Sequence, residues 1–273
     1  MDIYYLLLYF FVYGFLGWCT EVGFAACKSH RFVNRGFLNG PICPIYGVGV
    51  TAVIAVLTPY KENLILLYLL SVILVTVLEG LTGWAMDKIF HNKWWDYSQM
   101  PLNIGGYVCL LFSLIWGVAC VAIMESIHPL IHKALTFIPQ IAGIILIVIL
   151  GVLLFADLYV TASAIFKFNR RLAAMEKIAA EMREISDQIG QEIFERTIQA
   201  IELQEASRQK LDATANELKE TTEDLRRRIT DLHNAYVAFE PNRISRRLID
   251  AFPKMESHRY KEQLEELKKK WKR

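Results

Sequence analysis

The chain has 273 residues, of which 54% are hydrophobic, and its formal net charge is +2 at pH 7. The charged residues are unevenly distributed: few lie before Ala156, whereas nearly every third residue is charged from Lys167 onward. This division excludes an ordinary water-soluble globular domain, and it indicates an apolar half made for lipid followed by a polar half made for water.

Five stretches in the apolar half are long enough, or nearly so, to cross a hydrocarbon core of about 30 Å, which takes about 20 helical residues. We expect these spans at residues 3–26, 41–60, 64–86, 102–124 and 136–166, so that residues 1–166 form the transmembrane domain. The first stretch has no positive charge before it and exceeds the apolar length of a signal peptide, so it is predicted to be a span.

The cations between the spans predict the orientation of the chain. The first turn carries Lys28, Arg31 and Arg35, and the third carries Lys88 and Lys93. The second and fourth turns carry one lysine each. By the positive-inside rule, the N-terminus lies outside the cell, and turns one and three lie in the cytoplasm together with the polar tail.

The first turn leads back into the membrane through a segment that cannot be a plain helix. Asn39, Gly40, Pro41 and Pro44 follow one another there, just before Tyr46 and Gly47. Prolines leave backbone carbonyls unpaired, and lipid does not tolerate this. The segment is therefore expected to be buried in protein or to line a cavity.

A second return resembles the first in plan. It runs from Glu79 through Trp95, Asp96 and Tyr97 to Asn103. Both returns follow a span that descends from outside, so the two pairs of spans would form a parallel repeat. The aromatic residues of this turn are read either as an interfacial belt or as part of a turn bridged by Asp96.

The polar half is predicted to be helical. Leu211, Leu218, Leu225 and Leu232 recur at seven-residue steps with charged flanks, which is typical of a coiled coil. Gly190 interrupts the pattern, so residues 167–239 form either one helix or a helix pair. Residues 240–273 are predicted to form short amphipathic helices. The fold class expected is all-α: a polytopic membrane protein with about five transmembrane helices and a long cytoplasmic coiled-coil tail, through which the chain could form a homo-oligomer.

Three carboxylates fall within the spans: Glu21, Glu79 and Asp157. Charges in the membrane interior are costly, so such residues are functional candidates. At 1.5 Å per helical residue, all three fall in the same layer, roughly 10 to 15 Å above the inner surface of the membrane. With Asn39 and Asn103 they are candidates for a substrate or ion pathway. The alternative is structural: each carboxylate bonds a Tyr, a Trp, a backbone group or a nearby cation.

Several chemistries have no sequence support. P-loop, HExxH, GxSxG and Rossmann patterns are missing, and the five cysteines form no CxxC pair. We therefore expect neither an enzyme nor a cofactor or metal site, and any ATPase must be a separate chain. Basic residues of the tail alternate with acidic ones, which argues against nucleic-acid binding. The expected partners are thus the lipid bilayer and such an ATPase subunit.

Residues 35–47 read RGFLNGPICPIYG, and they are joined by Gly17-Trp18-x-x-Glu21, Trp95-Asp96-Tyr97-Ser98 and Asn103. With these motifs the chain resembles the type IV ABC-transporter permease family, the CmpB-like multi-pass membrane proteins of bacteria. The resemblance implies a bacterial plasma-membrane location and a permease-like role, and Asp87 stands where the family's glutamate is expected. The motif positions it assigns are Arg35, Gly36, Gly40, Pro41, Pro44, Tyr46, Gly47, Trp95, Asp96 and Tyr97.

Two function classes remain. The first is a transport component with an inward-facing polar cavity lined by the intramembrane carboxylates. The second is a non-transporting scaffold or sensor, in which the spans anchor a coiled coil that recruits or dimerises partners.

Overall fold

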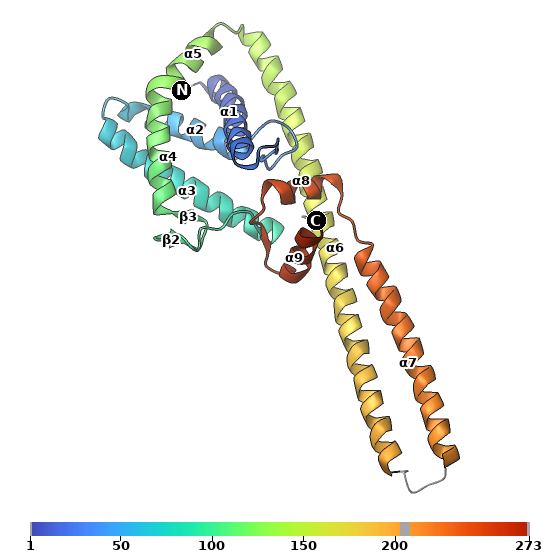
Figure 1. Ribbon diagram of the computed structural model, residues 1–273. Coiled ribbons are helices and arrows are strands. Elements are labelled where there is room, and N and C mark those ends of the chain that lie inside the picture. The colour runs from blue at the N-terminus through green and yellow to red at the C-terminus, as the bar shows by residue number, and fades with distance from the viewer. Residues whose placement is uncertain (1, 203–207, 272–273) are drawn as a thin grey trace. The chain divides into compact units, whose positions relative to one another are not determined.

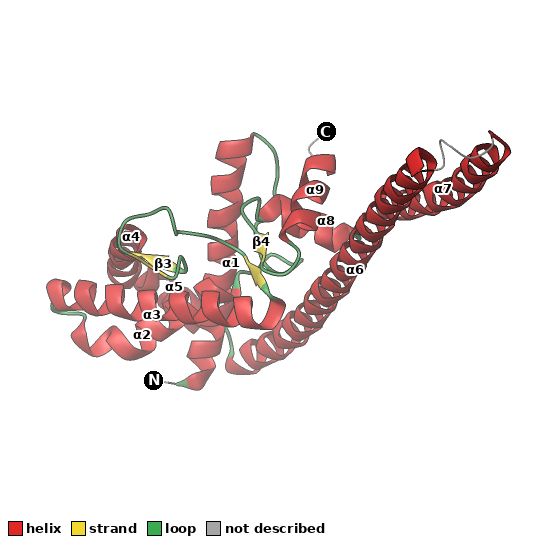
Figure 2. Ribbon diagram, turned by 90° about the horizontal axis from the view of Figure 1, so that it is seen from below, coloured by secondary structure: helices red, strands yellow, loops and turns green. Residues whose placement is uncertain are grey.

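The computed structural model describes the backbone of residues 2–202 and 208–271, and within these the side chains of residues 2–199 and 219–270. Helices dominate, which confirms the expected all-α class (Figures 1 and 2). In chain order the elements are α1 Ile3–Ser29, α2 Pro44–Leu57, η1 Thr58–Tyr60, α3 Leu64–Phe90, β1 Asn92–Lys93, β2 Asn103–Ile104, β3 Val108–Cys109, α4 Leu110–Ala122, η2 Ile123–Ile127, α5 His128–Thr136, α6 Gln140–Glu202, α7 Arg208–Val237, α8 Arg243–Ala251, β4 Glu256–Ser257 and α9 Lys261–Trp271.

Within the described part of the chain, four helical stretches are long and apolar enough to cross a membrane: Ile3–Ser29, Leu64–Phe90, Leu110–Thr136 and Gln140–Gln199. The second expected span, residues 41–60, is a shorter apolar helix over Pro44–Tyr60. It is short because helical structure starts only at Pro44, which occupies the first turn, where a missing N–H costs nothing.

The fourth span begins later than the sequence indicated, at Leu110 and not at residue 102. Residues 103–109 form an antiparallel hairpin instead, in which Asn103 pairs with Cys109 and Ile104 with Val108. Its turn contains Gly105 at φ 61° and Gly106 at φ 73°. Glycine adopts this left-handed backbone without steric penalty, so the Gly-Gly pair turns the chain before the helix can start.

The helices α1 and α3 have the same length and the same kind of ends. Each has 27 residues and a polar N-cap, Asp2 in α1 and Asn63 in α3. Each ends at a histidine in the left-handed conformation, His30 at φ 51° and His91 at φ 56°. These matching ends agree with the repeat suggested by the plan of the sequence.

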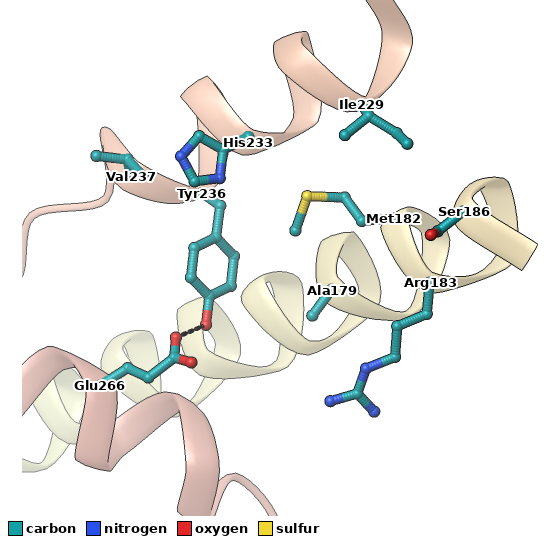
Figure 3. Close-up of a pocket in the computed structure, with 9 residues that line it drawn as sticks. All are labelled: Ala179, Met182, Arg183, Ser186, Ile229, His233, Tyr236, Val237 and Glu266. Carbon is teal, nitrogen blue, oxygen red and sulfur yellow. Dashed lines mark hydrogen bonds between the residues drawn. The ribbon is translucent and has the colours of Figure 1, made fainter. Parts of the chain in front are cut away.

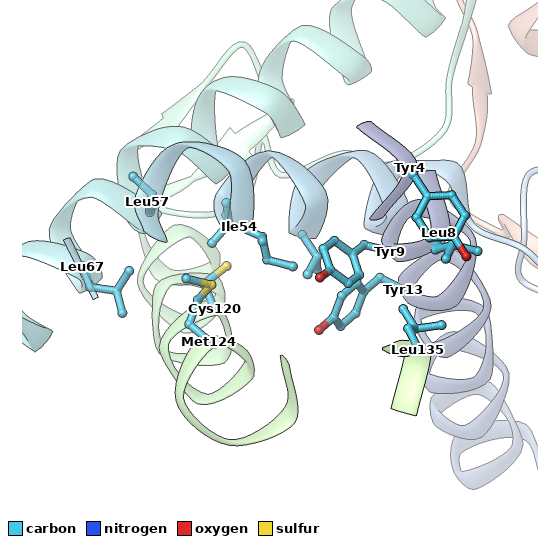
Figure 4. Close-up of a cluster of buried hydrophobic side chains, with 12 residues drawn as sticks. Tyr4, Leu8, Tyr9, Tyr13, Ile54, Leu57, Leu67, Cys120, Met124 and Leu135 are labelled. Atoms are coloured by element: carbon cyan, nitrogen blue, oxygen red, sulfur yellow. The ribbon is translucent and has the colours of Figure 1, made fainter. Parts of the chain in front are cut away.

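One hydrophobic cluster connects α1 to α5, and it includes Tyr4, Leu8, Val53, Ile54, Leu67, Cys120, Met124 and Leu135 (Figure 4). Two of its tyrosine hydroxyls, those of Tyr9 and Tyr13, are each paired with a histidine of α5. The Tyr9 hydroxyl lies 2.5 Å from His132 Nδ1, and the Tyr13 hydroxyl lies 3.1 Å from His128 Nδ1. Pairing the hydroxyl groups in this way lets the tyrosines lie in the apolar interior at small cost.

The chain folds as two compact units: residues 1–167 with 242–261, and residues 168–241 with 262–273. The amphipathic segment expected at 240–273 is therefore divided between them. We call residues 242–261 the strap, because they belong to the membrane unit although they follow the tail in sequence.

In the second unit, residues 168–202 of α6 run antiparallel to α7 as a helix pair, and α6 continues through Gly190, where the sequence suggested an interruption. Arg228 Nη2 and Glu181 Oε1 lie 2.6 Å apart across this pair. Leu225 and Leu232, two of the heptad leucines, are partly buried. The side chains of Leu211 and Leu218, the other two heptad leucines, lie outside the described residues.

Candidate functional site

Turn one, residues 30–43, is organised by the side chain of Asn34. Its Oδ1 accepts hydrogen bonds from Trp18 Nε1 at 2.8 Å and from the Gly36 amide at 3.1 Å. Its Nδ2 donates to the Asn39 carbonyl at 2.8 Å. One amide group thus closes the loop upon itself and ties it to α1, because the backbone there has no helical partners of its own.

The far side of turn one is held by Asp157 of α6. Its Oδ1 accepts from the Asn39 amide at 3.2 Å and from Asn39 Nδ2 at 2.8 Å, and its Oδ2 accepts from the Gly40 amide at 2.7 Å. Thr161 adds a hydroxyl 3.2 Å from Oδ1 and 2.9 Å from Asn39 Nδ2. Hydrogen bonds to a charged acceptor are strong, so Asp157 fixes the Asn39-Gly40 return at its midpoint.

The near side of turn one is held by Arg247 from α8 in the strap. Its guanidinium donates to Asn39 Oδ1 at 3.1 Å and to the carbonyls of Gly36 at 2.7 Å and Phe37 at 2.9 Å. Burial lowers the pKa of Arg247 from its ordinary value, and the negative charge of Asp157 counters this effect. The fork of donors suits a cluster of backbone carbonyls, which a lysine could not satisfy together.

Glu21 of α1 has two partners that come from turn one and from α2. Tyr46 donates its hydroxyl to Glu21 Oε1 at 2.7 Å, and Arg35 Nε lies 3.3 Å from Oε2. The tyrosine can approach because Gly17 presents no side chain where its ring crosses α1. Gly47 of α2 allows a similar close approach to α1, against the carbonyl of Phe10.

Turn three, residues 91–109, is held largely by its own residues. Lys93 Nζ lies 2.7 Å from Asp96 Oδ1, and the Ser98 amide donates to the same oxygen at 3.0 Å. Burial alone would raise the pKa of Asp96, but the hydrogen bonds from Lys93 and Ser98 lower it to about 2. Asn103 Nδ2 donates to the Met100 carbonyl at 2.8 Å, so Asn103 stabilises this turn from within.

Trp94 is buried in the fold, and Trp95 is partly buried. Trp95 Nε1 donates to the Tyr107 carbonyl at 2.9 Å. Trp94 is 4% exposed, and its ring packs edge-on against Phe37 of turn one and Phe252 of the strap. An interfacial belt is therefore not the role of Trp94; its ring joins turn one, turn three and the strap in one aromatic cluster.

Glu79 of α3 has a single hydrogen-bond partner within the described residues. The Tyr97 hydroxyl donates to Oε1 at 3.3 Å, and Oε2 is buried with no partner there. Burial, and after it the negative charge of Glu79, raise the pKa of Tyr97 above its ordinary value, and the charge of Glu21 adds to this rise. Tyr97 thus lies within the electrostatic reach of both glutamates.

The candidates from the sequence therefore separate into two groups. Glu79 bonds Tyr97, whereas Glu21 bonds Tyr46 and Arg35 and acts on Tyr97 only through its charge. Asp157 and Asn39 bond each other instead, and the bonds of Asn103 stay within turn three. No group of three or more metal-binding side chains gathers within the part of the chain that the structure describes.

Sequence reasoning missed three residues that build the site: Asn34, Thr161 and Arg247. Asn34 could have been found, because an Asn two residues before Gly36 is a common turn former. Thr161 lies one helical turn after Asp157, where it shares the same face. Arg247 gave no local signal, because it is one of several arginines in an amphipathic helix.

The strap also binds turn three. Strand β4 pairs antiparallel with β1, with Asn92 opposite Ser257, and His258 Nε2 lies 2.9 Å from Asp87 Oδ1. The Tyr107 hydroxyl is hydrogen-bonded to Oδ2 of the same carboxylate, which raises the pKa of Tyr107 to about 12. Asp87 thus connects α3, turn three and the strap.

Comparison with known proteins supports one assignment. Neither the curated proteins nor the solved structures contain a match to this chain. A sequence model of the family described as "Putative ABC-transporter type IV" matches residues 8–162. This range covers more than half of the chain, including turn one, turn three and Asp157. The chain therefore belongs to this family of ABC-transporter-related membrane proteins.

Proposed function

We propose that the chain is the permease-like component of a plasma-membrane transport system, with a polar pathway at Glu21 and Glu79 that opens toward the cytoplasm. The cations of turns one and three favour an orientation with these turns and the tail inside and the N-terminus outside, by the positive-inside rule. The family match supports a transport context, and a separate ATPase chain would supply the energy.

The observation that carries this proposal is the free oxygen of Glu79. A buried carboxylate oxygen without a donor costs several kcal/mol in a membrane helix, so it calls for a proton, a cation or a polar group of a substrate. Within the described residues, only Tyr97 donates to this carboxylate, and it does so to the other oxygen. Glu79 is the acid best placed to meet a ligand.

The remaining candidates divide by their partners. Arg35 offsets the charge of Glu21, and the amides of turn one surround Asp157. We assign Glu21, with its partners Tyr46 and Arg35, to the wall of the pathway. We assign Asp157, Asn39 and Asn103 to the frame that holds the two returns.

The scaffold function remains the second candidate, and one feature of the second unit favours it. An open groove of about 610 Å³ lies along the helix pair (Figure 3), and two of its lining residues are joined by a hydrogen bond from Tyr236 to Glu266. The residues that line it are Ala179, Met182, Arg183, Ser186, Ile229, His233, Tyr236, Val237 and Glu266. The helix pair packs within one chain, so recruitment through this groove needs no coiled-coil homo-oligomer.

The two functions can be separated in a strain that lacks the chain. Untargeted uptake and efflux profiling of that strain identifies solutes whose levels change, and variants are then tested for restoring them. Glu79→Gln should abolish restoration, with expression and detergent elution profile unchanged. Glu62→Gln, an exposed glutamate in the turn before α3, is the matched control and should restore fully.

A chain in which a flexible linker replaces residues 168–241 tests the scaffold. It keeps the strap, which belongs to the membrane unit. If the chain is a transport component, this variant should still restore at least part of the solute levels in the deletion strain. Full restoration by Glu79→Gln together with complete loss in the linker chain would overturn the transport proposal in favour of the scaffold.

A further inference from the structure

The strap is built to fold against the membrane unit. Asn242 caps α8 by accepting a hydrogen bond from the Ser245 amide at 2.8 Å. The helix then buries Leu248, Ile249 and Ala251 on one side and exposes Arg243 and Arg246 on the other. Such a strongly two-sided helix is stable only against an apolar partner. Arg247 lies on the same helix and points toward turn one, where its guanidinium is hydrogen-bonded.

The side chain of Asn39 is hydrogen-bonded on both of its polar atoms by residues that lie far apart in sequence. Its Nδ2 donates to Asp157 and to Thr161 on α6, whereas its Oδ1 accepts from Arg247 on α8. Both polar atoms of this side chain are therefore engaged, each by a different helix. A side chain held in this way has one orientation, and the backbone of turn one must follow it.

Turn one transmits this position to the pathway. Three residues after Gly40, the Cys43 amide donates to the Gly14 carbonyl at 2.9 Å, and α2 begins at the next residue. Tyr46 then meets Glu21 at 2.7 Å. The chain between Asn39 and Tyr46 is short and contains two prolines, so a shift of Asn39 would displace Tyr46.

We propose that Arg247 is a positioning residue of the membrane site, and that the strap belongs to this site and not to the cytoplasmic tail. With Asp157 it clamps the Asn39 return, and through the return it sets Tyr46 against Glu21. The guanidinium is required because it reaches one side-chain oxygen and two backbone carbonyls at once. Arg247 itself does not touch Glu21 or Glu79 in any contact of the described structure.

Cys43 offers a direct probe of this position. Its thiol is free and its side chain is 5% exposed, between turn one and α2. Cys120, which is free and 6% exposed, lies in the hydrophobic cluster and serves as a probe of general opening. Two full-length chains are made, one retaining Cys43 alone and one retaining Cys120 alone, with the other cysteines replaced by Ser or Ala.

The rate of labelling by a membrane-permeant maleimide is measured in each chain, without and with substitutions in α8. Arg247→Ala should raise the rate at Cys43 about tenfold or more, because the buried carbonyls and Asn39 lose their donors and the turn opens locally. The labelling rate at Cys120 should stay within about twofold of its rate in the parent chain. Arg247→Lys should give an intermediate rate at Cys43, and Arg243→Ala, which removes an exposed cation of the same helix, should leave both rates unchanged.

An unchanged rate at Cys43 in Arg247→Ala would overturn the assignment. An equal rise at Cys43 and Cys120 would also overturn it, since it would make Arg247 a general stabiliser. Should Arg247→Ala fail to accumulate, the ratio of the two rates in Arg247→Lys decides. The relevance to transport rests on the proposed function, but the thiol measurement needs no substrate, so the two proposals can fail separately.

Discussion

Turn one and turn three follow two helices that have equal lengths and the same kind of C-terminal cap, yet the two turns are held in different ways. A tyrosine bonds the glutamate of the preceding helix in both cases: Tyr46, just after turn one, lies 2.7 Å from Glu21, and Tyr97 of turn three lies 3.3 Å from Glu79. Turn one is held from outside by Asp157 and Arg247. Turn three is held mainly by its own Lys93, Asp96 and hairpin. Two turns with a similar sequence pattern can thus be stabilised mainly by distant residues or mainly by local ones.

The difference extends to the glutamates. Glu21 has a cation, Arg35, within 3.3 Å, whereas Glu79 has only Tyr97 among the described residues. The neutralised acid therefore precedes the turn that depends more on distant partners, and the acid with a free oxygen precedes the turn that is held mainly by its own residues. Turn one would serve as the frame of the site, and turn three as its ligand-facing side.

The largest expected effect comes from removing the distant acceptor of turn one. Asp157→Ala leaves the amides of Asn39 and Gly40 without their partner, and such a loss costs about 3 kcal/mol or more. Asp96→Ala, at the partly exposed ion pair of turn three, should cost about 1 kcal/mol. Thermal unfolding of both variants in detergent measures the difference. Equal losses would show that the two turns are not held differently.

A smaller loss of stability should distinguish the packing of α1 with α2 from the packing of α3 with α4. A Cβ at Gly47 would lie 2.5 Å from the carbonyl oxygen of Phe10, which cannot move without moving α1. A Cβ at Gly117 of α4 would meet the side chains of Val72 and Tyr68, which can shift. Gly47→Ala should therefore cost about 2 to 3 kcal/mol, and Gly117→Ala about 1 to 2.

Gly49→Ala provides the matched control for this comparison. No atom lies within 4 Å of a Cβ built there, and the residue belongs to the same helix as Gly47. Since alanine favours the helix over glycine, this variant should be neutral or more stable by up to about 1 kcal/mol. The melting temperatures of the three variants give the order, and a loss at Gly117 that exceeds the loss at Gly47 would contradict it.

The sequence predicted those features of the site that depend on local chemistry. Pro41 and Pro44 indicated that the return is not a plain helix, and a turn bridged by Asp96 was one of the two interpretations that the sequence left open. The start of the fourth helix was placed too early, because an apolar run gives no sign of where a Gly-Gly hairpin ends. The grip of Arg247 on Asn39 joins residues 208 positions apart. Such a contact follows from packing of the strap, and no periodicity or spacing indicates it.

The smallest effect is an acid dependence that belongs to turn three alone. The pKa of Asp96 is lowered to about 2, with Lys93 and Ser98 outweighing the effect of burial. A carboxylate whose folded pKa is depressed contributes stability above its unfolded pKa, near 4, and loses it as the pH falls through the folded value. Because the Asp96 side chain is still 30% exposed and solvent screens its ion pair, the contribution is about 1 kcal/mol, lost between about pH 4 and pH 2.

This loss can be followed by the fluorescence of Trp95, which lies beside Asp96 and bonds the Tyr107 carbonyl. The other tryptophans are replaced by Phe, and the signal is titrated from pH 5 to about pH 2 in the parent and in Asp96→Asn. The parent should show a transition in this range, and Asp96→Asn should shift or remove it, since the amide cannot ionise. A transition that is the same in both chains would mean that turn three does not depend on its own ion pair, and the contrast with turn one would then rest on Asp157 and Arg247 alone.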